Sequence, residues 1–369
     1  MSDELGGSAG ELLALIECYG PLTRAELAGR SGLPRTTATG FVTDLIRRGQ
    51  ITEQPGTDHE RTAQRAGRPA RTLRLSGPPT LVGVLSCSRS GIEAALVTYA
   101  GRIVARASRR AAARMAADLD AIAGPGSDLV EAMLAEAGCA REQLGRVVIS
   151  LARPVRPGES EAAVAERLGV PVSVQNDANL GSLGEAVYGA GRGHSSLAYV
   201  KLEHNIGVGL VINGRLHTGA SGFAGELGHV QVRDDGELCA CGGRGCLAAI
   251  VGSSLQDFVQ RSYEERLALP QVLALAAERE PAVRRVFADL GRMAGRPLAS
   301  FCTMLDPSAV VLGGSLGAAG QYVLDGIRES IDRHAAPVVA DSVVVIPGEL
   351  GDRAELLGGA ALARQLRLA

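Results

Sequence analysis

Apolar residues recur at helical spacing in three blocks of the first 50 residues. The first block ends at Gly20-Pro21, and its apolar positions are Leu12, Leu13, Leu15 and Ile16. Thr23 and Glu26 have the spacing of a capping box, which predicts a second helix from Thr23 to about Arg30. A third helix is predicted after Pro34 from apolar positions at i, i+3, i+4, i+7 and i+8, which are Ala38, Phe41, Val42, Leu45 and Ile46.

The turn Ser31-Gly32-Leu33 joins the second and third predicted helices. Two helices joined by so short a turn are typical of a helix-turn-helix, whose second helix enters the major groove of DNA. The outer face of the third helix is small, rich in hydroxyls and flanked by arginines, and it consists of Arg35, Thr36, Thr37, Gly40, Thr43 and Arg47. We predict that these positions contact double-stranded DNA.

Two strand-like segments, at 51–53 and 71–75, predict a β-hairpin wing after the third helix. Residues 61–74 contain five arginines and no acid, which is a charge pattern suited to phosphates. Within this stretch Gly67-Arg68-Pro69 is typical of an extended basic element that enters a minor groove. Arg65 and Arg68 are therefore predicted DNA contacts. The alternative is a three-helix protein-interaction module with a solvated arginine loop.

After Gly77-Pro78-Pro79 the pattern changes to short strands, predicted at 81–85, 94–99 and 103–107. The pattern returns at 197–202, at 209–212 and from 216, and the turn Asn213-Gly214-Arg215 resembles Ala100-Gly101-Arg102. This internal repeat predicts two similar α/β lobes with a small-molecule site in a cleft between them. A buried strand at 309–312 ends in Gly313-Gly314, where the backbone can approach a ligand closely.

Composition narrows the class of protein further. The 369 residues are 46% hydrophobic and carry a net charge of −2, without an apolar run long enough to span a bilayer. The acidic, glycine-rich N-terminus does not resemble a secretory signal, so we expect a cytoplasmic protein without membrane association. The absence of Trp and the 3% aromatic content argue against binding single-stranded nucleic acid by base stacking. The single lysine, Lys201, is interpreted as a feature of composition.

One imidazole and three thiols lie within eighteen residues, at His229, Cys239, Cys241 and Cys246. Zn²⁺ prefers four such ligands in a tetrahedron, and four protein ligands close the coordination sphere. We therefore predict a structural zinc site, the alternative being free cysteines beside an unrelated histidine.

These motifs resemble the ROK proteins, which comprise sugar-responsive repressors and sugar kinases. The resemblance rests on residues 225–229 with the cysteine run, on Gln175-Asn176-Asp177-Ala178-Asn179, and on the segments 305–314 and 357–361. The helix-turn-helix pattern is similar to the one that the repressors carry and the kinases lack. The resemblance implies a two-lobed body of the actin-like ATPase (ribonuclease H-like) fold behind a winged helix-turn-helix, with domains at 1–78, 79–185 and 186–369. It also implies that the C-terminal helix packs back on the first lobe.

The resemblance further implies a sugar effector held by Asn176, Asp177, Glu226 and His229, with Asp177 at the position of the general base in a kinase. The phosphate loops of the kinases are replaced here, by residues 84–90 and by Glu203-His204-Asn205-Ile206-Gly207. We therefore expect a transcriptional regulator, a repressor without catalytic residues, that binds an inverted-repeat operator as a homodimer or tetramer. The alternatives are an ATP-dependent sugar kinase and a DNA-binding protein that responds to no ligand.

Overall fold

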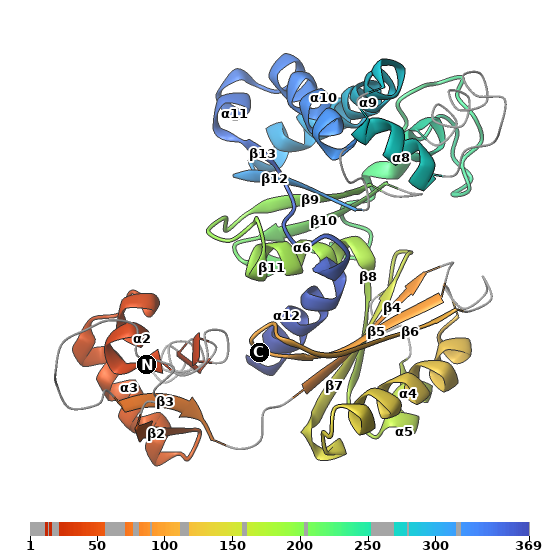
Figure 1. Ribbon diagram of the computed structural model, residues 1–369. Helices are drawn as coiled ribbons and strands as arrows, with labels where there is room; N and C mark the ends of the chain where they lie inside the picture. Colours follow the sequence, from red (N-terminus) through yellow and green to blue (C-terminus); the bar gives the residue numbers. More distant parts are fainter. Residues whose placement is uncertain are drawn as a thin grey trace.

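In the computed structural model of the protein the described residues are 12–13, 15–16, 22–55, 71–76, 81–88, 91–110, 118–156, 161–202, 206–251, 269–278, 280–314 and 319–368. They form an N-terminal head and a larger body made of two lobes (Figure 1). No helix among these residues is long and apolar enough to cross a membrane.

The head is a helix-turn-helix followed by a small sheet. Residues 12–13 and 15–16 are helical, and strand β1 (Leu22–Thr23) leads into helices α2 (Arg24–Ser31) and α3 (Arg35–Arg47). Gly32 ends α2 with a φ of 67°, a conformation that glycine adopts without strain. Strands β2 (Ile51–Pro55) and β3 (Arg71–Leu75) pair antiparallel, and β1 adds to β3. The second and third predicted helices and the two wing strands are confirmed, the first predicted helix is helical at its four described residues, and the loop between the strands lies outside the described residues.

The capping box at Thr23 holds the start of α2. The Thr23 hydroxyl accepts the Glu26 backbone N–H at 3.2 Å, and Glu26 Oε2 accepts the Thr23 backbone N–H at 2.8 Å. Hydrogen bonds from the backbone and hydroxyl of Thr23 lower the pKa of Glu26. The contribution of Glu26 to stability is therefore complete above the ordinary carboxyl pKa and is lost as the pH falls through the lowered value.

Thr23→Ala is expected to reduce the stability of the head by about 1 kcal/mol, because the cap bond to Glu26 disappears. Hydrogen exchange of the α2 amides measures this loss. Thr39→Ala is the matched control, since the Thr39 hydroxyl only donates to the Arg35 carbonyl within α3 and caps no helix end. Equal protection of the α2 amides in wild type and Thr23→Ala would contradict the prediction.

Each lobe contains a five-stranded sheet with the same strand order. The first sheet has the order β6-β5-β4-β7-β8, with strands Ile103–Arg110, Gly91–Thr98, Leu81–Ser88, Leu144–Leu151 and Val172–Asn176. The second has the order β11-β10-β9-β12-β13, with strands Arg215–Leu216, Ile206–Ile212, Leu197–Leu202, Ala309–Gly313 and Val344–Pro347. In both sheets the first three strands are antiparallel and the last two are parallel additions. The internal repeat predicted from the sequence is therefore a repeat of topology.

Helices cover both faces of each sheet (Figure 1). Helices α4 (Leu119–Glu136) and α5 (Ala162–Leu168) lie on the outer face of the first sheet. Helices α8 (Leu269–Ala277), α9 (Pro281–Leu305), α10 (Ala319–His334) and α11 (Pro337–Ser342) lie on the outer side of the second lobe. Helices α6 (Asp177–Tyr188) and α12 (Ala354–Leu368) pack on each other between the two sheets, with α6 against β9 and β10 and α12 against β4, β5 and β7. Three short 3-10 helices complete the described elements, at Arg141–Gln143, Leu227–His229 and Gly351–Arg353.

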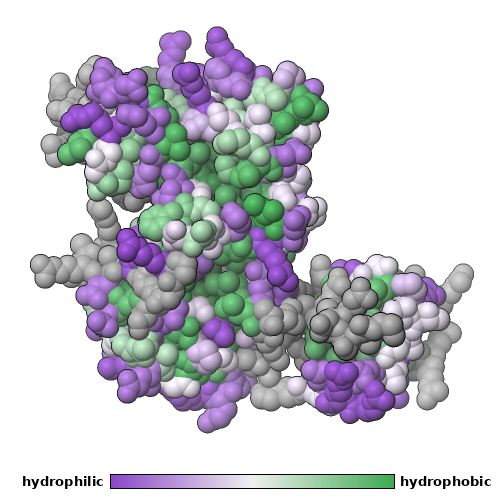
Figure 2. Space-filling model, turned by 180° about the vertical axis from the view of Figure 1, so that it is seen from behind, coloured by the Kyte–Doolittle hydropathy of each residue, from purple (hydrophilic) through white to green (hydrophobic). Residues whose placement is uncertain are grey.

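The central helix pair belongs to a hydrophobic core that both lobes share. Val82 and Val84 of β4 enter this core together with Leu197 and Tyr199 of β9, whereas the intervening positions face the outer cores. Gly184 and Gly358 allow the close approach of α6 and α12, because a Cβ at Gly358 would lie 1.8 Å from the Leu180 carbonyl oxygen. Figure 2 shows hydrophilic residues over the outer ends of the body and more hydrophobic residues near its middle. The domain boundaries predicted at 78/79 and 185/186 stay predictions.

Candidate functional site

Helix α3 presents the face that the sequence assigns to DNA. Arg35, Thr36, Thr37, Gly40, Thr43 and Arg47 are all exposed, whereas Ala38, Val42 and Leu45 are buried in the head. Asp44 lies beside this face and pairs with Arg47 and Arg48, the latter at 2.6 Å. Arg65 and Arg68 lie outside the described residues. The face therefore offers hydroxyls, guanidinium groups and one small residue to a groove.

The four predicted metal ligands converge. One ligand atom from each of His229, Cys239, Cys241 and Cys246 lies within 4.8 Å of the others. Cys239 Sγ is 3.5 Å from His229 Nδ1, and Cys241 Sγ is 3.7 Å from Cys246 Sγ. The loop is tight, because a Cβ at Gly245 would lie 1.6 Å from the Arg233 carbonyl oxygen, so glycine is required at this position.

The protonation of the thiols fits a cation at this point. The backbone N–H of Gly243 donates to Cys241 Sγ at 3.4 Å and lowers the pKa of Cys241. Burial, followed by the neighbouring thiols Cys241 and Cys239, raises the pKa of Cys246 to about 11. A divalent metal ion bound here would hold these side chains as thiolates. The cluster is thus compatible with a metal ion held by one nitrogen and three sulfur atoms.

Asn176 and Asp177 lie at the end of β8 and the start of α6. The Asn176 side-chain oxygen caps α6 by accepting the Asn179 backbone N–H at 3.1 Å, and its amide nitrogen donates to Asp177 Oδ1 at 3.0 Å. Asp177 Oδ1 also accepts the Ala178 backbone N–H at 2.8 Å. The helix cap and the end of β8 therefore hold both side chains in the same position between the lobes.

Glu226 lies beside the Cys/His cluster, where it contacts His229. Glu226 Oε2 is 3.8 Å from His229 Nε2, while Nδ1 of the same ring faces Cys239. Burial raises the pKa of Glu226, with the charge of Asp177 adding to the effect and His229 opposing it. Of the four residues assigned to the effector, Asn176 and Asp177 thus form one contacting pair, and Glu226 and His229 form a second.

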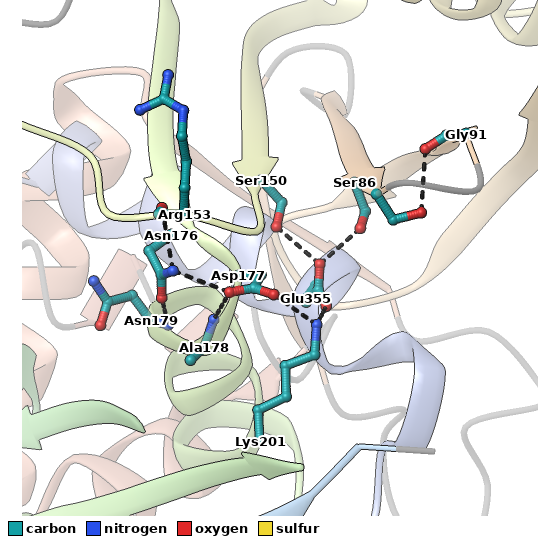
Figure 3. Close-up of polar contacts among 11 residues, drawn as sticks. Ser86, Gly91, Ser150, Arg153, Asn176, Asp177, Ala178, Asn179, Lys201 and Glu355 are labelled. Atoms are coloured by element: carbon teal, nitrogen blue, oxygen red, sulfur yellow. Dashed lines mark hydrogen bonds and ion pairs between the residues drawn. The ribbon is translucent and has the colours of Figure 1, made fainter. Parts of the chain in front are cut away.

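Sequence reasoning missed a buried ionic network beside Asp177. Lys201 Nζ lies 2.8 Å from Asp177 Oδ2 and 2.5 Å from Glu355 Oε1. The other carboxylate oxygen of Glu355 accepts hydroxyl hydrogen bonds from Ser86 at 2.6 Å and Ser150 at 2.8 Å (Figure 3). The available signal is that the single lysine of the chain lies in the apolar strand Leu-Ala-Tyr-Val-Lys-Leu, a position that composition alone does not explain.

The two carboxylates of this network differ in protonation. Burial raises the pKa of Asp177, and the positive charge of Lys201 offsets only part of the rise. Burial also opposes ionisation of Glu355, but Lys201 and the hydroxyls of Ser86 and Ser150 lower its pKa overall. Glu355 is therefore the main counter-ion of Lys201, and Asp177 is the carboxylate that accepts a proton more readily.

Each of the two segments that replace the phosphate loops of the kinases lies only partly within the described residues. Residues 84–88 continue β4 to its end, and Ser86 there donates to Glu355. Residues 89–90 and 203–205 lie outside the described residues. The expectation for Glu203-His204-Asn205 therefore stays a prediction.

The fold and these groups define a class: a duplicated, two-lobed α/β body with a Cys/His cluster beside its interlobe residues, preceded by a helix-turn-helix. The ROK family profile matches residues 91–366, and the IclR helix-turn-helix domain profile matches residues 12–55. The chain belongs to the ROK family, as the sequence motifs predicted.

Curated relatives include both repressors and kinases. The chain is 30% identical to a xylose repressor of Bacillus subtilis over 198 residues, which is 54% of this chain and 52% of the relative. It is 32% identical to a glucokinase of Streptomyces coelicolor over 262 residues, which is 65% of this chain and 82% of the relative. The chain thus spans about half the length of the xylose repressors that it matches.

Solved structures agree with the fold. A ROK family transcriptional regulator, described as a homolog of the E. coli MLC protein, superposes with a TM-score of 0.78 at 23% identity, covering 99% of this chain and 97% of that chain. A ROK family glucokinase from Streptomyces griseus, in complex with glucose and AMPPNP, superposes with a TM-score of 0.62 at 28% identity and covers 77% of this chain and 99% of that chain. The predicted actin-like, two-lobed architecture is confirmed.

Proposed function

We propose that the protein is a DNA-binding transcriptional repressor whose operator affinity responds to a monosaccharide bound between the lobes of its body. The observation that carries the proposal is the joining of an IclR-type helix-turn-helix, with an exposed polar face on α3, to a ROK body. The xylose repressors among the relatives support a pentose or hexose as effector. A DNA-binding role places the protein in the cytoplasm.

DNA binding would use α3 in the major groove and the wing in the minor groove. Arg35, Thr36, Thr37, Gly40, Thr43 and Arg47 are the proposed major-groove positions, and Arg65 and Arg68 are the proposed wing contacts. A homodimer or tetramer with cyclic symmetry would place two α3 helices on the half-sites of an inverted repeat.

In the proposed effector site the hydroxyl groups of the sugar would form hydrogen bonds with four side chains. These are Asn176, Asp177, Glu226 and His229. Carboxylates accept hydrogen bonds from vicinal hydroxyls, amides both donate and accept them, and the four residues form two contacting pairs, Asn176 with Asp177 and Glu226 with His229. The metal would be a structural Zn²⁺ held by His229, Cys239, Cys241 and Cys246. Bound there, it would hold the His229 ring, whose Nε2 lies 3.8 Å from Glu226 Oε2.

A sugar kinase is the second candidate, and the 32% identity to a glucokinase favours it. In a kinase Asp177 would take the proton of the sugar hydroxyl. The phosphate loops that the resemblance assigns to the kinases are replaced in this chain, by residues 84–90 and 203–207, and phosphoryl transfer depends on the positioning that such loops supply. The repressor is therefore the stronger proposal, with no catalytic role for Asp177.

The test is the selection of bound duplexes from a random DNA pool, followed by anisotropy titrations of the selected site with D-xylose, D-glucose and N-acetyl-D-glucosamine. We expect an inverted repeat, and an operator Kd that changes at least about tenfold with one of the sugars, within the usual range of coupling between sites. ATP consumption with the same sugars should equal the no-enzyme blank. Failure to enrich any duplex, or ATP turnover that Asp177→Asn abolishes, would contradict the proposal.

A further inference from the structure

Three polar side chains continue rows of apolar residues that face the core shared by the two lobes. They are Lys201, Ser86 and Ser150. On β9, Leu197 and Tyr199 enter the core between the lobes, and Lys201 is the next residue on that face. On β4 and β7 the same row ends in Ser86 and Ser150, after Val84 and Val148. Strand periodicity therefore directs one ammonium group and two hydroxyls from different sheets toward the helices that lie between them.

The network joins both lobes to α12. Lys201 belongs to the second sheet, and Ser86 and Ser150 belong to the first. Glu355, in the first turn of α12, contacts all three, at 2.5 Å from Lys201, 2.6 Å from Ser86 and 2.8 Å from Ser150. Asp177, at the start of α6, lies 2.8 Å from Lys201 on the other side (Figure 3). Lys201 is thus the one link in this network between Asp177 and Glu355.

The network is buried and charged. The side chain of Lys201 is 11% exposed, and those of Asp177 and Glu355 are 16% exposed. Removing one partner from such a group leaves an uncompensated buried charge, which is far more costly than loss of a surface ion pair. The three charges therefore depend on one another.

From this geometry we infer that Lys201 is a positioning residue of the effector site: it orients Asp177 toward the ligand and transmits ligand binding to Glu355, α12 and the first sheet. The effector part of this inference rests on the proposed function. A sugar hydroxyl that donates to Asp177 shares that carboxylate with the Lys201 ammonium. The Lys201–Glu355 contact, and with it the seating of α12 on β4 and β7, then differs between the free and the bound protein.

Lys201 can be labelled selectively, because it is the only lysine of the chain. Incorporation of ¹⁵Nζ-lysine gives one ammonium NMR signal from the whole protein. Burial and two carboxylate partners slow its proton exchange, so we expect the signal to be visible at neutral pH. Asp177→Asn and Glu355→Gln, which keep the shape of the side chains, should each shift this signal, and a saturating sugar from the panel should shift it in the wild type.

The functional measurement uses Lys201→Met in the full chain. We expect its affinity for the responsive sugar to fall at least about tenfold, and the effect of sugar on operator binding to disappear, since coupled sites commonly differ by 5- to 150-fold. Arg192→Met is the matched control, because it removes an exposed cation of the same lobe that is 3.4 Å from Glu349. The control should keep wild-type affinity for both ligands.

The results separate this inference from the proposed function. If the ¹⁵Nζ signal is unmoved by Asp177→Asn and by Glu355→Gln, the bridge is wrong even when sugar-responsive DNA binding is intact. If both variants shift the signal but a sugar that changes operator affinity does not, Lys201 bridges the carboxylates without transmitting ligand binding, and the inference is overturned. If the signal moves with sugar but operator binding does not respond, the regulatory function fails while the role of Lys201 at the site stands. These NMR results hold even where Lys201→Met fails to fold.

Discussion

Gly40→Glu is expected to abolish operator binding while the head stays folded. Gly40 is exposed in the middle of α3, and a Cβ built there meets nothing within 4 Å. Glutamate is a better helix former than glycine by roughly 0.5–1 kcal/mol, so the helix itself should gain stability. In a major groove the new carboxylate would face base edges and phosphates, where its charge is repelled and its hydration lost.

We expect the operator Kd of Gly40→Glu to rise about 100-fold or more at physiological salt, approaching nonspecific binding. Fluorescence anisotropy measures the affinity, and circular dichroism checks that the head is folded. Gly29→Glu is the matched control, because Gly29 is exposed on α2 with equally open space and lies outside the predicted contact face. Wild-type affinity in Gly40→Glu, or an equal loss in Gly29→Glu, would remove α3 as the recognition helix.

Cys246→Ser is expected to release the bound metal and to destabilise the second lobe. Cys246 is 2% exposed, and its backbone pairs with Gln231 in an isolated β-bridge, so the ligand and the loop geometry are linked. A serine hydroxyl is a poor zinc ligand, and a structural site with three ligands binds the metal weakly. The loss of about 3 kcal/mol or more should lower the melting temperature by roughly 10 °C, at about 2–4 °C per kcal/mol for a lobe of this size.

Zinc content by atomic spectroscopy should fall from one equivalent per chain to near zero, with a parallel drop in the melting temperature. Cys139→Ser is the matched control, since Cys139 is a half-buried free thiol outside the cluster and should keep both values. Sugar affinity should fall with the metal, because His229 loses the bond that holds its ring. A Cys246→Ser protein with full zinc content and unchanged melting would rule out the assigned ligand set.

Local signals in the sequence predicted the head and the order of its elements. The capping box at Thr23 forms with the expected partners, and the buried positions of α3 are those at helical spacing. These features depend on residues three or four apart, which lie on the same face of a helix whatever surrounds it. The metal cluster was predictable for a similar reason, since its four ligands are few in kind and close along the chain.

The repeat of strands also followed from the sequence, because period-two alternation and the matched turns at 100–102 and 213–215 are local. The packing of α6 on α12 between the two sheets did not follow from the sequence. Gly184 and Gly358 are 174 positions apart (358 minus 184), and only the packing of α6 on α12 explains why both lack a side chain.

The sequence by itself determined the helix-turn-helix, the duplicated lobes and the four residues of the Cys/His cluster, because each depends on short-range spacing or on an unusual residue type. Only the tertiary structure decided that Lys201 meets Glu355, 154 residues away, and that two serines from the other lobe complete the contact. The physical reason is that a buried charge is tolerated only where the fold supplies its partners. Those partners come from strands and helices that are far apart along the chain.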